Sequence, residues 1–305
     1  MATARGAIMK ILVGIDTAAT YRPVVALLGR LDFEGAEATL AHSVDVLYPV
    51  PMYGVAEAAM GADFVESLNQ AGQEALQEAL DLACLHKLKA DTAILDGAAG
   101  PALIEFADRN HYDLIAIHSV RKGRLGSLFL GSVARGLAIG AHQSVLISKR
   151  EIATAGPLKA VFATDHSAYA QRALDMFIAL KPRGIRNVHV VSAAWMNEYE
   201  AYVAQYDLAK MSGSTEEWVE AQLRTKNHEA VEKLSAAGFE ATSAVKSGTP
   251  DVAIREAMEL TKADLLVMGA QGHGFMHRLF IGSTSLHQVV AEPYSVLILR
   301  PEPGA

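Results

Sequence analysis

Cysteine is almost absent from this chain, since Cys84 is its single cysteine in 305 residues. One cysteine cannot form an internal disulfide. No apolar run approaches the roughly 20 residues that a membrane-spanning helix needs. The opening MATARGAIMKILVGID lacks the basic region, long apolar stretch and cleavage site of a secretory signal. Together these absences predict a protein of the reducing cytoplasm that does not contact a membrane.

Several common catalytic motifs are also missing. The sequence has no G-x4-G-K-[S/T], no G-x-S-x-G, no H-E-x-x-H, no pair of C-x-x-C motifs and no G-x-G-x-x-G. A P-loop lysine, a zinc-protease helix and a dinucleotide fingerprint are therefore excluded. The net charge of -7 excludes a broad attraction to nucleic acid or to anionic lipid. A phosphate group, if one is bound, must be held by local contacts.

What is present is a sequence repeated after roughly 150 residues. ILVGIDTAA aligns with AVFATDHSA, which matches Asp16 to Asp165, and further along Asp113 matches Asp264. The polar stretch KREIATAGPLK, with its Gly-Pro pair, separates the copies. We predict an N-terminal domain over residues 1–150 and a C-terminal domain over residues 157–305.

Short apolar segments alternate with helical patterns in both copies. Because these segments are apolar throughout and rich in β-branched residues, they suit strands buried on both faces of a parallel sheet. The fold class is therefore α/β, with a doubly wound sheet in each half. The last strands, SVLIS and SVLIL, would aggregate as bare edges. We expect them to pair with each other, which makes one chain a pseudo-dimer. The expected strands are Lys10–Ile15, Ala38–Ser43, Thr92–Leu95, Leu114–His118, Ser144–Ser148, Lys159–Thr164, Val188–Ala193, Ala241–Lys246, Leu265–Met268 and Ser295–Leu299.

A glycine-rich loop follows the fourth strand of the second copy. The stretch GAQGHGFMHRLFIGS begins at Gly269 and fits G-x2-G-x9-G-[S/T] through Gly269, Gly272, Gly282 and Ser283. Glycines permit positive φ and close approach of the backbone to a ligand. The start of the next helix offers unpaired N–H groups and a positive dipole end. The loop is therefore suited to a phosphate chain.

This spaced motif, together with Asp165 at the end of the first strand, resembles the universal stress protein family in its tandem, two-domain form. The resemblance covers nearly the whole chain. It implies a five-stranded parallel sheet of order 3-2-1-4-5 in each half, of the adenine nucleotide alpha-hydrolase-like kind. It also implies binding of ATP or a related adenine nucleotide, with or without Mg²⁺, in the C-terminal half.

The resemblance further assigns contacts residue by residue. It places Asp165, a hydrogen-bond acceptor, and Ala163 beside the adenosine. Ala193 stands where other members often have valine, which implies a looser base pocket. The full set of implied contacts is Ala163, Asp165, Ala193 and Met268 at the adenosine, Gly269 and Gly272 at the ribose and phosphates, and Gly282, Ser283 and Thr284 as phosphate donors.

In the first copy the stretch HSVRKGRLGSLFLGS has the same spacing as this motif, but His118 and Arg121 replace its first two glycines. Side chains there enter the phosphate space, so we predict that this half does not bind ATP in the family's way. Two further hypotheses stay open. Either a basic cluster holds an anion or it is a solvated surface; its members are Arg121, Lys122 and Arg124. Either His42, His118 and Asp16 bind a divalent metal or they form a hydrogen-bonded trio.

Irregular segments rich in methionine and aromatic residues follow the second strand of each copy. They form a lid or an apolar pocket, which leaves room for a lipid-like ligand in the first half, or they pack over the core. The residues concerned are Met52, Tyr53, Met60, Trp195, Met196, Tyr199, Tyr202 and Tyr206.

The sequence predicts no catalytic residue set and no metal site. His273, His277 and Arg278 lie in the phosphate loop and could assist hydrolysis, but the loop has no acidic residue to hold Mg²⁺. We expect a sensor or regulatory module with slow ATP hydrolysis at most. The rivals are an ATPase or nucleotidyl-transferring enzyme, and a structural or interaction protein with both sites empty. Association of two chains is left open.

Overall fold

The structure is a computed structural model, and it describes residues 8–45, 57–119, 131–152, 155–195, 215–272 and 281–302. Each half alternates strands and helices, as the sequence predicts. The N-terminal half contains β1 (Lys10–Ile15), α1 (Arg22–Leu31), β2 (Glu37–Val44), α2 (Glu57–Leu85), β3 (Lys89–Asp96), α3 (Ala99–Asn110), β4 (Leu114–His118), α4 (Ser132–Gly140) and β5 (Ser144–Ser148). The C-terminal half contains β6 (Leu158–Ala163), α5 (Ala168–Leu180), β7 (Ile185–Ala194), α7 (Thr215–Ala236), β8 (Glu240–Ser247), α8 (Pro250–Thr261), β9 (Leu265–Gly269), α9 (Ser283–Ala291) and β10 (Ser295–Leu299).

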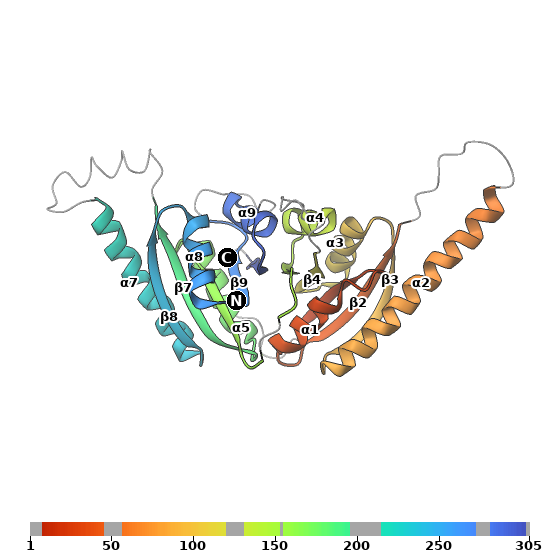
Figure 1. Cartoon of the computed structure of the whole chain (residues 1–305), viewed down its shortest axis with the longest axis horizontal. Helices are drawn as coiled ribbons and strands as arrows, with labels where there is room; N and C mark the ends of the chain where they lie inside the picture. Colours follow the sequence, from red (N-terminus) through yellow and green to blue (C-terminus); the bar gives the residue numbers. More distant parts are fainter. Residues whose placement is uncertain are drawn as a thin grey trace.

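The strands of both halves form one ten-stranded sheet of order β3-β2-β1-β4-β5-β10-β9-β6-β7-β8. Within each half the strands are parallel and follow the order 3-2-1-4-5. The two last strands pair antiparallel, with Leu297 opposite Leu146. This confirms that the edge strands cover each other, and it produces the two wings that meet at the centre of Figure 1.

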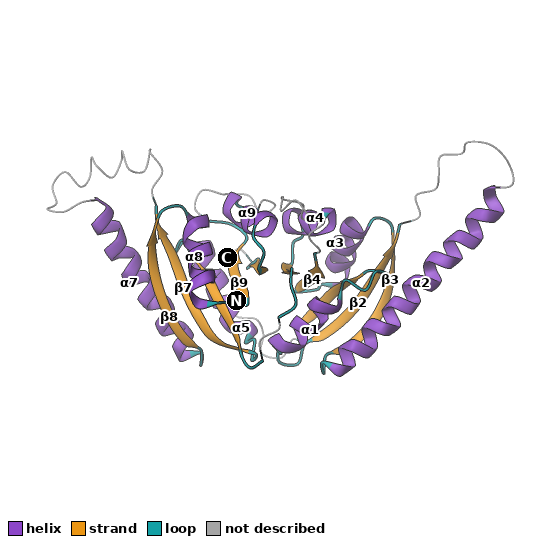
Figure 2. Cartoon of the chain, viewed as in Figure 1, coloured by secondary structure: helices purple, strands orange, loops and turns teal. Residues whose placement is uncertain are grey.

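Two hydrophobic layers sandwich this sheet. One cluster joins α1, α2, α5 and α7 to one face, and it includes Leu28, Ala79, Phe177 and Leu234. The other cluster joins α3, α4, α8 and α9 to the opposite face. Figure 2 shows the long helices α2 and α7 on the outer flanks of the two wings. Because each cluster contains residues of both halves, the two copies share both hydrophobic layers.

The duplication is visible in single hydrogen bonds. The Lys10 N–H donates to Asp113 Oδ2 at 2.8 Å, and the Lys159 N–H donates to Asp264 Oδ2 at 2.9 Å. In both halves a carboxylate before the fourth strand thus accepts from an amide at the beginning of the half's first strand, β1 or β6. The pairing of Asp113 with Asp264, seen in the sequence, has this physical basis.

The halves also meet at the turn before β7. Arg183 donates to both carboxylate oxygens of Asp32, at 3.1 and 2.9 Å. The Gly184 N–H donates to Leu31 O at 3.1 Å. A Cβ at Gly184 would lie 1.6 Å from Arg30 O, so only glycine fits there. In the part of the chain that the structure describes, no helix is long and apolar enough to cross a membrane.

Candidate functional site

A cavity of about 320 Å³ opens at the carboxyl ends of β6, β7 and β9 in the C-terminal half. This is where the strand order reverses, which is the usual ligand position in a doubly wound sheet. Every residue that the sequence assigned to nucleotide contact lines this cavity: Ala163, Asp165, Ala193, Met268, Gly269, Gly272, Gly282, Ser283 and Thr284. Residues from four separate segments are therefore brought together as expected.

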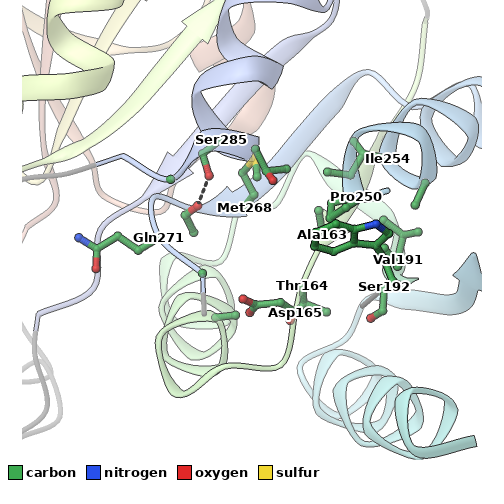
Figure 3. A pocket seen from close by; sticks show the side chains of 18 of the residues that line it. Ala163, Thr164, Asp165, Val191, Ser192, Pro250, Ile254, Met268, Gln271 and Ser285 are labelled. Carbon is green, nitrogen blue, oxygen red and sulfur yellow. Dashed lines mark hydrogen bonds between the residues drawn. The ribbon is translucent and has the colours of Figure 1, made fainter. Parts of the chain in front are cut away.

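The cavity has two ends of different character, and Figure 3 shows them side by side. Ala163, Val191, Pro250 and Ile254 gather at one end, and all four are apolar. Gln271 and Ser285 lie toward the other end, near the start of α9, and Asp165 lies below. The apolar end suits a flat ring, and the end at α9 suits an anion.

The helix start at α9 leaves several amides without helical acceptors. Its N-cap is Gly282, with no side-chain cap, and the first helical hydrogen bond runs from Leu286 N to Gly282 O. The amides of Ser283, Thr284 and Ser285 thus belong to the first turn, which has no intrahelical acceptors. The Ser285 hydroxyl donates to Gly269 O at 2.9 Å and ties this turn to the end of β9. The positive end of the helix dipole adds to this preference for an anion.

Gly269 and Gly272 are needed because neighbouring atoms pack closely against them, and not because their backbone is left-handed. Neither Gly269 nor Gly272 is among the positive-φ residues, so the sequence-based argument from φ was wrong for them. A Cβ at Gly272 would lie 2.6 Å from Asp165 Oδ2, and one at Gly269 would lie 3.0 Å from the Tyr169 ring. The missing side chain at Gly272 therefore lets the loop lie against Asp165, and the missing side chain at Gly269 leaves room for the Tyr169 ring.

A buried polar network lies directly behind Asp165. His166 Nε2 is 2.9 Å from Asn227 Oδ1, and the Ser192 hydroxyl donates to the same oxygen at 2.7 Å. Because Asn227 Nδ2 donates to Ala244 O, its Oδ1 must accept, so His166 carries its proton on Nε2. Burial lowers the pKa of His166 below its ordinary value, against the opposing effect of the Asn227 hydrogen bond.

His166 also has a φ of 57°. This left-handed conformation costs a non-glycine residue roughly 1–2 kcal/mol, and it persists where the surroundings enforce it. The His166, Ser192 and Asn227 network was not found from the sequence. The one sign of this network in the sequence is Asn227, a polar residue on the buried face of α7, which packs on β7.

The N-terminal half has a corresponding cavity of about 340 Å³. His118 lines it where the second half has the bare Gly269, and burial lowers the pKa of this imidazole. Asp16 is engaged within its own turn, since Thr20 donates to it from both its amide, at 2.8 Å, and its hydroxyl. The Gly131 N–H donates to Ser119 Oγ at 3.4 Å. The equivalent groups of the second half are also engaged, since Asp165 Oδ1 accepts from the Ser167 N–H and the Gly282 N–H, which the resemblance gave as a phosphate donor, donates to Ala270 O at 2.7 Å. The two cavities therefore differ chiefly at His118, which replaces the bare Gly269.

The sequence left open whether His42, His118 and Asp16 bind a divalent metal or form a hydrogen-bonded trio, and in the structure each of the three bonds to a partner outside the trio. Within the described residues, no group of three His, Cys, Asp or Glu side chains could hold a metal ion. His42 Nδ1 donates to Ile15 O, 2.9 Å away, and the ring packs over Gly72 of α2. A glycine at position 72 is required because a Cβ there would lie 2.4 Å from the His42 ring.

Some residues named from the sequence lie outside the described ranges. They are Met52, Tyr53, Arg121, Lys122, Arg124, Met196, Tyr199, Tyr202, Tyr206, His273, His277 and Arg278. Met60 lies in α2, but its side chain is not described. The anion, lid and hydrolysis hypotheses that rest on these residues therefore stay predictions.

The fold and the duplicated site define a tandem α/β protein whose two halves have corresponding cavities at the carboxyl ends of their strands. The sequence model of the universal stress protein family matches residues 7–149 and again residues 158–300. The chain therefore belongs to the universal stress protein family, in a tandem two-domain form. A universal stress protein of Methanocaldococcus jannaschii is 35% identical over 85 residues, which is 28% of this chain. This chain spans 50% of the length of that relative.

Solved structures agree with this fold. A universal stress protein from Archaeoglobus fulgidus superposes with a TM-score of 0.68 at 20% identity, over 95% of this chain and 98% of that one. A universal stress protein from Pseudomonas aeruginosa, described as putative in its title, gives a TM-score of 0.54 at 19% identity, over 97% and 94% of the two chains. At these identities the likeness concerns the fold alone.

Proposed function

We propose that this universal stress protein binds ATP or a related adenine nucleotide in its C-terminal half, one molecule per chain, and acts as a sensor or regulatory module in a stress response. The observation that carries the proposal is the C-terminal cavity, which joins an apolar slot to uncapped amides at the start of α9. A nucleotide has the same two parts, a flat base and an anionic tail.

The phosphates would meet the first turn of α9. Ser283 and Thr284 supply main-chain N–H groups there, and Gly269 and Gly272 keep the approach free of side chains. The Gly282 N–H already donates to Ala270 O at 2.7 Å. A helix N-terminus of this kind attracts phosphate through its unpaired donors and its dipole. No lysine takes part among the described lining residues.

The adenine would meet the exposed edge of β7. The last residue of β6 is Ala163, which pairs with Val191, whereas β7 continues to Ala194. The Thr164 N–H still donates to Val191 O, so by the alternation of a parallel strand the N–H and C=O of Ala193 face the same side, where β6 has ended. One donor beside one acceptor fits N1 and the amino group of adenine. Guanine presents the reverse pattern on those atoms.

Binding fits this site better than rapid hydrolysis does. Asp165 is the one carboxylate among the described lining residues, and its Oδ1 accepts from the Ser167 N–H at 3.0 Å. A single acid is a weak Mg²⁺ site, since efficient phosphoryl transfer relies on firmly held metal. Slow hydrolysis is the most we expect. Rapid steady-state release of ADP or AMP by the purified protein would favour an ATPase or nucleotidyl-transferring enzyme instead.

Titration calorimetry with ATP tests the proposal, and the duplication supplies a matched control. Gly282 and Gly131 hold the same N-cap position in α9 and α4, and both have negative φ. Gly282→Val places two methyl groups at the phosphate end and should abolish binding, whereas Gly131→Val should leave it intact. A stoichiometry near one is expected. Binding that survives Gly282→Val and is lost with Gly131→Val would place the nucleotide in the other half and refute the proposal.

A further inference from the structure

Trp195 lies beside the apolar end of the C-terminal cavity. It is the first residue after β7, it lines the cavity, and 48% of its surface is exposed. An indole this exposed is unusual next to an apolar wall, because large aromatic side chains gain most by burial. The exposure indicates that Trp195 serves something other than core packing.

Its neighbour Ala193, two residues earlier on β7, packs against one of the core clusters, whereas Trp195 is exposed. The sequence left open whether the aromatic residues after the second strand pack over the core or form a pocket. For Trp195 the structure favours the pocket.

No other aromatic ring among the described residues lines this cavity. In the N-terminal half the residue after the second strand is Asp45, which does not line the corresponding cavity. The N-terminal cavity has an aromatic residue of its own, the buried Tyr21 at the start of α1. What is specific to the C-terminal half is an aromatic residue directly after the second strand. A ring at this point matters because most side chains at the apolar end belong to alanine, valine, proline and isoleucine, which offer no hydrogen bond to a base, and the Ser192 hydroxyl there already donates to Asn227 Oδ1.

We propose that Trp195 is the stacking wall of the base site and sets its preference for purines over pyrimidines. The inference rests on the proposed nucleotide binding and adds how the base is held. The indole face contacts the base plane while the edge of β7 contacts the edge of the ring. A purine has a larger face than a pyrimidine, so stacking favours ATP over CTP.

Calorimetry on the full chain tests this with ATP, CTP and inorganic tripolyphosphate as probes. Trp195→Ala should weaken ATP binding roughly tenfold or more, as expected for loss of a stacked ring, and reduce the preference for ATP over CTP. Tripolyphosphate binding should not change, because it has no base. Trp195→Phe should restore most of the affinity for ATP. Trp218→Ala is the matched control, since Trp218 lies on α7, is 43% exposed and does not line the cavity.

Tryptophan fluorescence gives a second measurement. The chain has two tryptophans, so Trp218→Phe leaves Trp195 as the single reporter. ATP should quench the emission of Trp218→Phe and leave that of Trp195→Phe unchanged, while tripolyphosphate should affect neither.

The outcomes separate the two proposals. If ATP binds the unmodified protein and binds Trp195→Ala equally well or more tightly, the indole is not a stacking wall and only this inference is overturned. If Trp195→Ala weakens tripolyphosphate as much as ATP, Trp195 shapes the whole cavity and the inference is again overturned. If neither ATP nor tripolyphosphate binds the unmodified protein, both proposals fail.

Discussion

Lys149 and Arg300 cap helices in each other's half of the chain. Each is the first residue after the last strand of its half, β5 for Lys149 and β10 for Arg300. The Lys149 ammonium donates to Gln288 O at 3.0 Å and to Glu292 O at 2.7 Å, at the carboxyl end of α9. The Arg300 guanidinium donates to Ala138 O and Ala141 O, at the carboxyl end of α4. Cations at these ends also complement the helix dipoles.

Loss of one of these caps should destabilise the whole chain. We expect Arg300→Met to lower the free energy of unfolding by about 2–4 kcal/mol, because two hydrogen bonds from a charged group are lost. Urea unfolding followed by circular dichroism measures this. Arg224→Met is the control, since Arg224 forms an exposed i,i+4 pair with Glu220 and should change stability by less than about 0.5 kcal/mol. If both changes lowered the free energy of unfolding by the same amount, the cap at Arg300 would stabilise the chain no more than an exposed ion pair does.

Acid should destabilise the protein through His166. Burial lowers the pKa of this imidazole below 6.5, so between the lowered pKa and 6.5 the unfolded chain binds more protons than the folded one. The stability contribution is therefore present above pH 6.5 and is lost as the pH falls toward the folded pKa. His118 and His189 shift in the same direction, so the comparison must be made with a variant.

His166→Gln isolates this contribution. We expect it to be less stable than the unmodified protein at pH 8, where the neutral imidazole makes its buried contacts, and the difference should shrink toward pH 5. Urea unfolding at several pH values measures it. A difference that stays constant with pH would mean that His166 does not titrate on unfolding.

Gly272→Ala should weaken nucleotide binding with little effect on folding. The added methyl group would lie 2.6 Å from Asp165 Oδ2, which is the end of a side chain and can move aside. Displacing that carboxylate should weaken ATP binding by about tenfold or more, since a hydrogen bond from a ligand to a charged group is worth about 1.5–3 kcal/mol. Calorimetry and thermal unfolding together test this. Gly136→Ala in α4 is the control, because a Cβ there meets open space.

Gly184→Ala should instead destabilise the fold, because Gly184 lies at the contact between the two halves and away from the cavity. Its Cβ would lie 1.6 Å from a backbone oxygen, Arg30 O, which cannot move without shifting the end of α1. We expect a loss of more than about 3 kcal/mol in the free energy of unfolding. Gly140→Ala, with its nearest atom at 3.4 Å, is a suitable comparison. Soluble, equally stable Gly184→Ala protein would contradict the close approach of the two halves.

The strands could be predicted closely because their apolar, β-branched runs are buried on both faces. β1, β4, β5 and β10 have the bounds that the sequence predicts. The edge strands β3 and β8 extend beyond the predicted segments, and both contain many exposed residues. Burial on one face leaves polar residues in a strand, so hydrophobicity alone underestimates its length.

The hydrogen-bond network of His166, Ser192 and Asn227 could not be predicted from the sequence. His166 and Asn227 are 61 residues apart and meet only when α7 packs on β7. In the first half, His42 on β2 and Gly72 on α2 meet in a different arrangement, with the ring on the strand and the glycine on the helix. Such pairs have no fixed spacing in the sequence, because side-chain packing selects them.

The sequence by itself determined the duplication, the α/β class, the pairing of the last strands and the glycine frame of one site, because each depends on local apolar patterns or on residues near each other in the chain. The tertiary structure decided why Gly272 must lack a side chain, which buried polar groups support Asp165 and how Lys149 and Arg300 cap each other's half. Those relationships depend on contact distances between segments far apart in sequence, and only the packed chain fixes such distances.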